Sequence, residues 1–322
     1  MDVAIAGGGL IGLASALELA ERGLSVTVFD AQTPGQASWA AAGILGPQSE
    51  AHAPSPLVEL CTKSYALYPQ FVQKLQADCG FRQNGTLHLA FTEPEAEQLQ
   101  ARRKWQTEAG LRIEERQHEK ALLALFFPDE GQVDNRKLVQ ALRAACERAK
   151  VTFEKKAVQS LEDLKAKTKV ICAGSWSAQL VQGLNVFPQK GQLLLLDERA
   201  PSQVIFGGGG YAVPRNGRTL IGATAEDAGF ETATTAEGRE YLVKVARNLG
   251  FEGRAIDQWA GLRPVTPDGL PILDKLKSGT IVATGHYRNG VLLTPMTARV
   301  VAALVCGEPP PVDLTSFSAL RR

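Results

Sequence analysis

The sequence lacks long apolar runs, blocks of like charge and internal repeats, and each absence narrows what the protein can do. No apolar run in the 322 residues is long enough to cross a bilayer, so no membrane span is predicted. The formal net charge is only +1, without a basic or acidic cluster. Nucleic acid and anionic membranes are therefore poor candidate partners.

Motifs of hydrolases and phosphotransferases are also missing. The chain has no nucleophile elbow, no Walker A lysine motif and no HExxH-type spacing, so we expect neither of these chemistries and no metal. The apolar N-terminus lacks a positively charged segment and carries Asp2, which argues against a signal peptide. The cysteines form no CxxC pair and are typical of reduced thiols in a cytoplasmic protein. They are Cys61, Cys79, Cys146, Cys172 and Cys306.

What the sequence does contain is clearest in residues 3–30, which predict a strand, a glycine turn, a helix and a second strand. Val3–Ala6 is a short apolar run, as a buried strand requires. A GxGxxG motif follows, whose glycines allow a tight turn, close approach of a pyrophosphate and close helix packing. These glycines are Gly7, Gly9 and Gly12. Asp30 ends the second strand, where a carboxylate can bind ribose hydroxyls.

The rest of the chain predicts a mixture of helices and strands. Helices are expected over 58–79, 94–109, 116–127, 134–149, 234–248 and 291–305. Asp134 is a good N-cap for the helix over 134–149, and Thr234 and Glu237 predict a capping box for the helix over 234–248. Strands are expected within 81–92 around a turn at Asn84-Gly85, and at 151–153, 158, 169–173, 190–196, 204–213, 219–223 and 280–284. The strands between 190 and 223 lie in a polar context, which favours an antiparallel sheet.

This order of elements predicts an α/β protein with two interleaved domains. A Rossmann-like nucleotide-binding domain is expected over residues 1–80, 131–180 and 255–322. An α+β substrate domain, built on a mostly antiparallel sheet, is expected over residues 81–130 and 181–254.

A second informative cluster comprises residues 261–271 (GLRPVTPDGLP) and 281–295 (IVATGHYRNGVLLTP). The second segment predicts a strand, a glycine loop and a helix start that favours negative charge, such as that of a reduced flavin. Arg263 and Arg288 lie in these segments, and arginine binds carboxylates through two charge-assisted hydrogen bonds. His286 is a candidate acid–base group, although a lone histidine is more often structural.

These segments together resemble the D-amino acid oxidase family of FAD enzymes. The resemblance is carried by GGGLIG…VFD, SWAAAGIL at 38–45, AGSWS at 173–177 and the two C-terminal segments, and it covers nearly the whole chain. Within the family, the sequence looks most like the glycine oxidases of bacterial thiamine biosynthesis. The resemblance implies a cytoplasmic flavoprotein oxidoreductase, with the nucleotide-binding domain holding FAD, and it allows a homo-oligomer.

The resemblance also implies roles for individual residues. Arg263 would bind the substrate carboxylate with Tyr211 as its helper, and Arg288 and Ile44 would lie near the substrate. Besides the three motif glycines, FAD would be held by Leu10, Ile11, Asp30, Ala31, Ala37, Ser38, Ala42, Gly43, Ile44, Val158, Gly174, His286, Tyr287, Arg288, Asn289, Gly290, Val291 and Leu292.

Two departures from the family pattern stand out. Asp30 occupies a position where the family more often has glutamate, which is a tolerable change. Relatives of the sarcosine type carry a cysteine that bonds to FAD near the position of Gly261, and this chain has no cysteine nearby. FAD is therefore expected to be non-covalent.

The implied activity is oxidative deamination of glycine and other small amines. Hydride transfer to flavin and reoxidation by dioxygen would give an imine or glyoxylate, ammonia and hydrogen peroxide, without an obligatory acid–base residue. Glycine, sarcosine, D-alanine and D-proline all stay open as substrates. Two alternatives also stay open: an FAD dehydrogenase for D-amino acids or secondary amines with another electron acceptor, and a flavin-free NAD(P)-binding or regulatory module.

Overall fold

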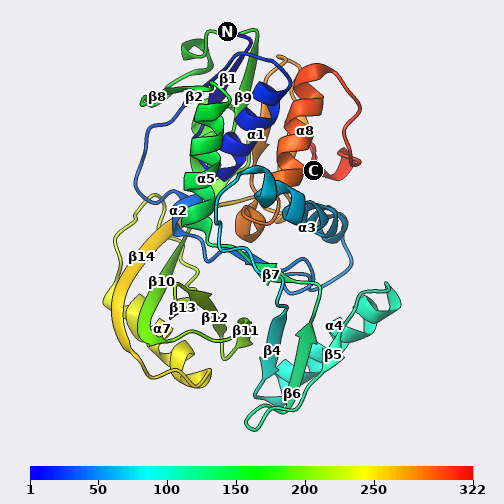
Figure 1. The fold of residues 1–322 in the computed structure, drawn as a ribbon, viewed down its shortest axis with the longest axis vertical. Coiled ribbons are helices and arrows are strands. Elements are labelled where there is room, and N and C mark those ends of the chain that lie inside the picture. The colour runs from blue at the N-terminus through cyan, green and yellow to red at the C-terminus, as the bar shows by residue number, and fades with distance from the viewer. Residues whose placement is uncertain (322) are drawn as a thin grey trace.

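The structure, a computed structural model, describes residues 1–321 and contains two large β-sheets with helices packed on them. In Figure 1 the six-stranded sheet lies in the upper half and the eight-stranded sheet in the lower half. One sheet is mainly parallel and the other mainly antiparallel, so the predicted α/β class is confirmed.

The six-stranded sheet begins with the glycine-motif segment, and four of its neighbouring strand pairs are parallel. In order across the sheet its strands are β15 (Ile272–Lys275), β16 (Ile281–Thr284), β9 (Thr168–Ile171), β1 (Val3–Ala6), β2 (Val26–Phe29) and β8 (Thr152–Glu154). Only β15 runs antiparallel to its neighbour. Every residue of β1, β2 and β16 is buried, as expected for strands covered on both faces.

Helices from three parts of the chain cover one face of this sheet and form the main core. They are α1 (Leu10–Glu21), α5 (Asn135–Arg148) and α8 (Thr294–Cys306), with α3 (Pro56–Lys74) packed on α8 (Figure 1). The Asp134 carboxylate accepts hydrogen bonds from the backbone N–H groups of Arg136 and Lys137 and so caps α5 as predicted.

Short elements cover the other face of the same sheet. They include η1 (Leu161–Asp163), η2 (Gly174–Trp176) and α6 (Ser177–Leu180). Buried aliphatic side chains of this layer, among them Leu164, Val181 and Val186, pack against β1. Near the C-terminus, η4 (Thr315–Phe317) contacts β15.

The eight-stranded sheet combines two distant segments of the chain. In order its strands are β14 (Arg254–Val265), β10 (Phe187–Arg199), β13 (Arg218–Gly222), β12 (Gly210–Arg215), β11 (Val204–Gly207), β4 (Thr86–Ala90), β6 (Leu123–Phe127) and β5 (Glu114–Glu115). β11 and β4 run parallel and join the two segments. α7 (Ala236–Asn248) packs against one face, and α4 (Glu93–Glu108) packs beside β4 and β6.

Alternation along β10 decides what each face of this sheet contacts. Leu194 and Leu196 pack with α7, whereas Gly191 and Leu193 line a cavity on the opposite face. A two-stranded ribbon of β3 (Ile44–Leu45) and β7 (Gly131–Gln132) lies where the chain passes between the large sheets.

Two predicted elements are wrong. Residues 116–127 form no helix, because Leu123–Phe127 is a fully buried strand, β6, paired with β4 and β5. The hairpin at Asn84-Gly85 is absent, since only one strand forms in this segment and it pairs with β6 and β11. Gly85, at φ +72°, instead turns the chain into β4.

Other differences concern element ends and one missed strand. The helix expected over 58–79 ends at Lys74, and the helix expected from 291 begins at Thr294. Val158 lies outside any strand, and the cap of α7 is Thr235, not Thr234. The twelve-residue strand β14 was not predicted.

The expected division into two domains stays a prediction. The segments 81–130 and 181–254 supply most strands of the eight-stranded sheet, but β14, which the prediction places in the nucleotide-binding part, pairs with β10. Across residues 1–321, no helix combines the length and apolar character needed to span a bilayer.

Candidate active site

A cavity of about 510 Å³ is lined by residues from both large sheets. Its walls include the glycine turn, the loop over residues 36–44, the ends of β9 and β16 and the inner face of the eight-stranded sheet. This volume lies within the range of about 300–1,000 Å³ that is typical of sites for small ligands and cofactors.

At one end of the cavity, the glycine turn is closely packed against its neighbours. Gly7 has φ +114°, and a Cβ there would lie 2.3 Å from the Cys172 carbonyl oxygen. A Cβ on Gly12 would lie 1.9 Å from the Gly7 carbonyl oxygen. Both positions therefore require glycine, as the motif predicts.

Gly8, which the sequence reasoning did not single out, is equally constrained. A Cβ at Gly8 would lie 2.5 Å from Asp30 Oδ2, so this glycine lets the carboxylate approach the turn. Asp30 Oδ1 accepts hydrogen bonds of 3.0 Å from Gln32 N and Gln36 Nε2. The acid is thus fixed at the end of β2, beside the turn.

The loop that follows β2 is joined to this turn and forms the next stretch of cavity wall. It includes the short helix α2 (Ala37–Ala40). The Ser38 hydroxyl accepts a hydrogen bond of 2.9 Å from Leu10 N, at the start of α1. Gly43 has φ +80°, and a Cβ there would lie 1.9 Å from the Val133 carbonyl oxygen.

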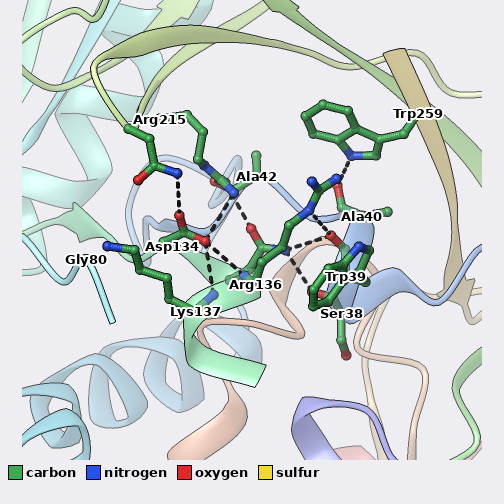
Figure 2. A network of polar contacts seen from close by, with 12 residues as sticks. Ser38, Trp39, Ala40, Ala42, Gly80, Asp134, Arg136, Lys137, Arg215 and Trp259 are labelled. Atoms are coloured by element: carbon green, nitrogen blue, oxygen red, sulfur yellow. Dashed lines mark hydrogen bonds and ion pairs between the residues drawn. The ribbon is translucent and has the colours of Figure 1, made fainter. Parts of the chain in front are cut away.

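A buried arginine from β12 holds this loop from the side of the larger sheet (Figure 2). Arg215 donates hydrogen bonds to the Ala42 carbonyl at 2.8 Å and to Asn135 Oδ1 at 2.9 Å, and lies 3.4 Å from Asp134 Oδ1. Asn135 Nδ2 in turn donates to the carbonyl oxygens of Ser38 and Trp39, at 2.8 and 3.1 Å.

Two further side chains hold the same loop, as Figure 2 shows. Trp259 Nε1, from β14, donates a hydrogen bond of 2.9 Å to the Ala40 carbonyl. Arg136 Nε donates to the Trp39 carbonyl at 3.2 Å, and its guanidinium lies 4.4 Å from the centre of the Trp259 ring. The sequence reasoning missed this clamp, which we define as Asn135, Arg136, Arg215 and Trp259.

Arg263, on β14, lines the same cavity. Its Nη1 donates a hydrogen bond of 3.1 Å to the Thr224 carbonyl, and within residues 1–321 no acidic side chain pairs with it. A Cβ on Gly191 would lie 2.3 Å from Arg263 Nη1, so glycine on β10 makes room for the guanidinium. The predicted partner Tyr211 also lines the cavity. Burial raises the pKa of the Tyr211 phenol, while the charges of Arg263 and Arg288 oppose that rise.

The second predicted arginine has an acidic neighbour. Arg288 Nη1 lies 3.5 Å from Glu50 Oε2, and its guanidinium lies 5.3 Å from the centre of the Tyr287 ring. Tyr287 and Arg288 belong to η3 (Tyr287–Asn289). Glu50 lines the cavity but was not predicted. It follows the SWAAAGIL segment by only five residues, and nothing in its local pattern marks it.

His286 lines the cavity but its side chain is buried. Its Nε2 lies 3.1 Å from the Thr297 hydroxyl, and burial lowers its pKa to about 3. The imidazole is therefore neutral near pH 7, in agreement with the structural alternative for this histidine.

Most of the predicted site residues line this one cavity. They are Gly7, Gly9, Leu10, Ile11, Asp30, Ala31, Ala37, Ser38, Ala42, Gly43, Ile44, Val158, Gly174, Tyr211, Arg263, His286, Tyr287, Arg288, Gly290 and Val291. Three predicted residues do not line the cavity and pack behind its lining residues. Gly12 packs on the glycine turn, Leu292 lies in the main core, and Asn289 is buried in η3.

Comparison with known proteins assigns the fold and the cofactor. Residues 2–304 match the family described as FAD dependent oxidoreductase. The chain is 36% identical to a glycine oxidase from Geobacillus kaustophilus, covering 99% of this chain and 97% of that protein. It is 35% identical to a bifunctional protein ThiO/ThiG from Synechocystis, covering 99% of this chain and 54% of that protein.

A solved structure agrees with these relatives. The crystal structure of glycine oxidase from Geobacillus kaustophilus superposes with a TM-score of 0.91 at 35% identity, covering 100% of this chain and 98% of that chain. The expected fold class and the expected cofactor, FAD, are thereby confirmed. The chain belongs to the FAD dependent oxidoreductase family.

Proposed function

We propose that this protein oxidises glycine and other small amines, among them sarcosine and small D-amino acids. Glycine, dioxygen and water would give glyoxylate, ammonia and hydrogen peroxide, with an imine as the first product. Bound FAD supplies the two-electron acceptor for this chemistry. Glycine oxidase relatives along the whole chain support the substrate class, and Arg263 supplies the structural observation on which it depends.

The residues at the turn end of the cavity fit the nucleotide part of FAD. Asp30 is placed to accept hydrogen bonds from ribose hydroxyls, and the N-terminal N–H groups of α1 suit the phosphates. The missing Cβ atoms at Gly7 and Gly8 let the Cys172 carbonyl and the Asp30 carboxylate pack against the turn, whose backbone lines the cavity. We therefore propose these residues, with the loop over 36–44, as the FAD-binding surface.

We further propose that FAD is held without a covalent bond. Cys172 is the cysteine that lines the cavity, and it lies beside Gly7 at the turn end. Burial raises its pKa to about 12, so the thiol stays protonated near pH 7 and is poorly suited to bond formation. Acid treatment or denaturation should therefore release all of the flavin.

The unpaired guanidinium of Arg263 is the observation that carries the substrate assignment. An arginine facing a cavity without an acidic partner is suited to bind a carboxylate by two parallel hydrogen bonds. Tyr211, beside it, can donate a further hydrogen bond while its phenol stays protonated. The pair would hold a small amino acid by its carboxylate and leave the amine end free to face the flavin.

Replacement of Arg263 tests this assignment. R263A should raise the KM for glycine at least about a hundredfold, equivalent to about 2.7 kcal/mol, because charge-assisted hydrogen bonds to the carboxylate are lost. Steady-state peroxide release measures KM, and the visible flavin spectrum checks that the variant still holds FAD. An unchanged KM for glycine would contradict the assignment of Arg263 to the substrate carboxylate.

The electron acceptor and the metabolic role need separate measurements. One peroxide per glycine consumed under air supports an oxidase, whereas dye reduction without peroxide would assign a dehydrogenase.

We also propose a role in the thiazole branch of thiamine biosynthesis, supported by the relatives named bifunctional protein ThiO/ThiG. We also propose that the protein is cytoplasmic and forms a homo-oligomer.

A further inference from the structure

Two arginines reach the substrate end of the cavity, but their charges are balanced differently. Arg263 has a carbonyl acceptor and no acidic partner within residues 1–321. Arg288 has Glu50, whose Oε2 lies 3.5 Å from its Nη1. All three residues line the same cavity, and all three charges act on the Tyr211 phenol. Around Tyr211, the cavity thus presents the unpaired charge of Arg263 and the Glu50–Arg288 ion pair.

Glu50 is held in place by a buried network at the preceding residues. Glu130 is fully buried, and its Oε1 accepts hydrogen bonds from Gln48 N at 2.6 Å and Ser49 N at 2.7 Å. Its Oε2 accepts hydrogen bonds from the hydroxyls of Ser49 and Thr86. A buried carboxylate with four donors is costly to disturb, so the backbone that leads into Glu50 is fixed.

The same segment is also joined to the cavity wall. Arg102 donates a hydrogen bond of 2.6 Å to the Ser49 carbonyl and lies 3.0 Å from His88 Nδ1. The His88 ring stacks on Phe206, a cavity-lining residue, with 4.4 Å between ring centres. The position of Glu50 is therefore coupled to the wall that carries the substrate site.

We propose that Glu50 makes the enzyme selective for the charge of its substrate. By neutralising Arg288, it favours amines with one carboxylate over amines with two. This inference rests on the proposed function. A substrate with two carboxylates would place one on Arg263 and bring the other near the Glu50 carboxylate. The like charges repel, and Arg288 has no free charge to compensate.

The test compares glycine with iminodiacetate, a secondary amine in which the glycine nitrogen carries a carboxymethyl group and so a second carboxylate, on the FAD-loaded enzyme. E50Q removes the charge and keeps the shape, so the ratio of kcat/KM for iminodiacetate over glycine should rise at least tenfold. E50D keeps the charge and should leave the ratio within about threefold of the wild type. E50Q/R288M should return the ratio toward the wild-type value, because the freed guanidinium is the group that accepts the second carboxylate.

Two outcomes would overturn the proposal: an E50Q ratio within twofold of the wild type, or an E50D ratio that rises as far as that of E50Q. Should E50Q fail to retain FAD, R288M carries the test, since the unpaired Glu50 should then lower the ratio at least tenfold.

A binding measurement separates this inference from the proposed function. Flavin absorbance titrations with malonate and acetate should show the same shift in E50Q even if glycine is not oxidised.

Discussion

His286 shows, at the scale of single residues, how burial sets the behaviour of a titratable group. Its pKa of about 3 in the folded protein lies well below the value of about 6.5 expected for the unfolded chain. Between these values the unfolded state binds a proton that the folded state does not, so stability falls as the pH is lowered from 6.5 toward 3. The acid sensitivity of the fold should therefore depend partly on this ring.

The prediction is that H286Q unfolds with a weaker pH dependence than the wild type. Between pH 7.5 and pH 5, the wild type should lose about 2 kcal/mol more of its free energy of unfolding than the variant does, from about 1.5 pH units at 1.36 kcal/mol each. Urea titrations at the two pH values, with saturating FAD, measure the difference. Parallel losses in both proteins would show that folding does not lower the pKa of His286.

Single residues were predictable where a local motif specifies them. Gly7 and Gly12 follow from the GxGxxG spacing, and their packing leaves no room for a side chain. Glu50 and Gly191 were not predictable, because each matters through its contact with a residue far away in the sequence. Glu50 pairs with Arg288, and Gly191 makes room for Arg263. Motif reasoning therefore locates the turn end of the cavity better than the substrate end.

At the scale of elements, the clamp fixes the loop over residues 36–44 to β12, β14 and α5, in addition to the loop's own backbone hydrogen bonds. R215M should remove the donors to the Ala42 carbonyl and Asn135 Oδ1 and leave Asp134 without its ion pair. We expect the Kd for FAD to rise at least tenfold, equivalent to about 1.4 kcal/mol. Fluorescence titration of the flavin-free protein with FAD measures this change.

R218M is the matched control for that variant. Arg218 lies on the neighbouring strand β13, pairs with Asp197 at 3.3 Å and has a side chain that is 51% exposed. An exposed ion pair contributes little to stability, so FAD affinity should stay within about twofold of the wild type. If R215M binds FAD as tightly as R218M does, the clamp does not position the loop.

The same scale explains which elements the sequence predicted poorly. A five-residue apolar run such as Leu123–Phe127 fits a buried strand or part of a helix equally well, since periodicity cannot separate them over so short a length. Its partner β4 lies more than thirty residues earlier in the chain. The capped helix α5 was predictable because Asp134 and its apolar face are local features.

At the scale of the whole molecule, the cavity is built by both sheets, so FAD bound there would contact both and stabilise the complete fold. A ligand that binds only the folded state adds about 1.4 kcal/mol for each tenfold rise in its free concentration above Kd. Unfolding of the flavin-free protein at increasing FAD should therefore follow one cooperative transition whose midpoint rises steadily with the logarithm of FAD concentration. Two transitions, of which only one responded to FAD, would instead show that the six-stranded sheet binds the cofactor by itself. The larger sheet would then contribute to the substrate site without being stabilised by FAD.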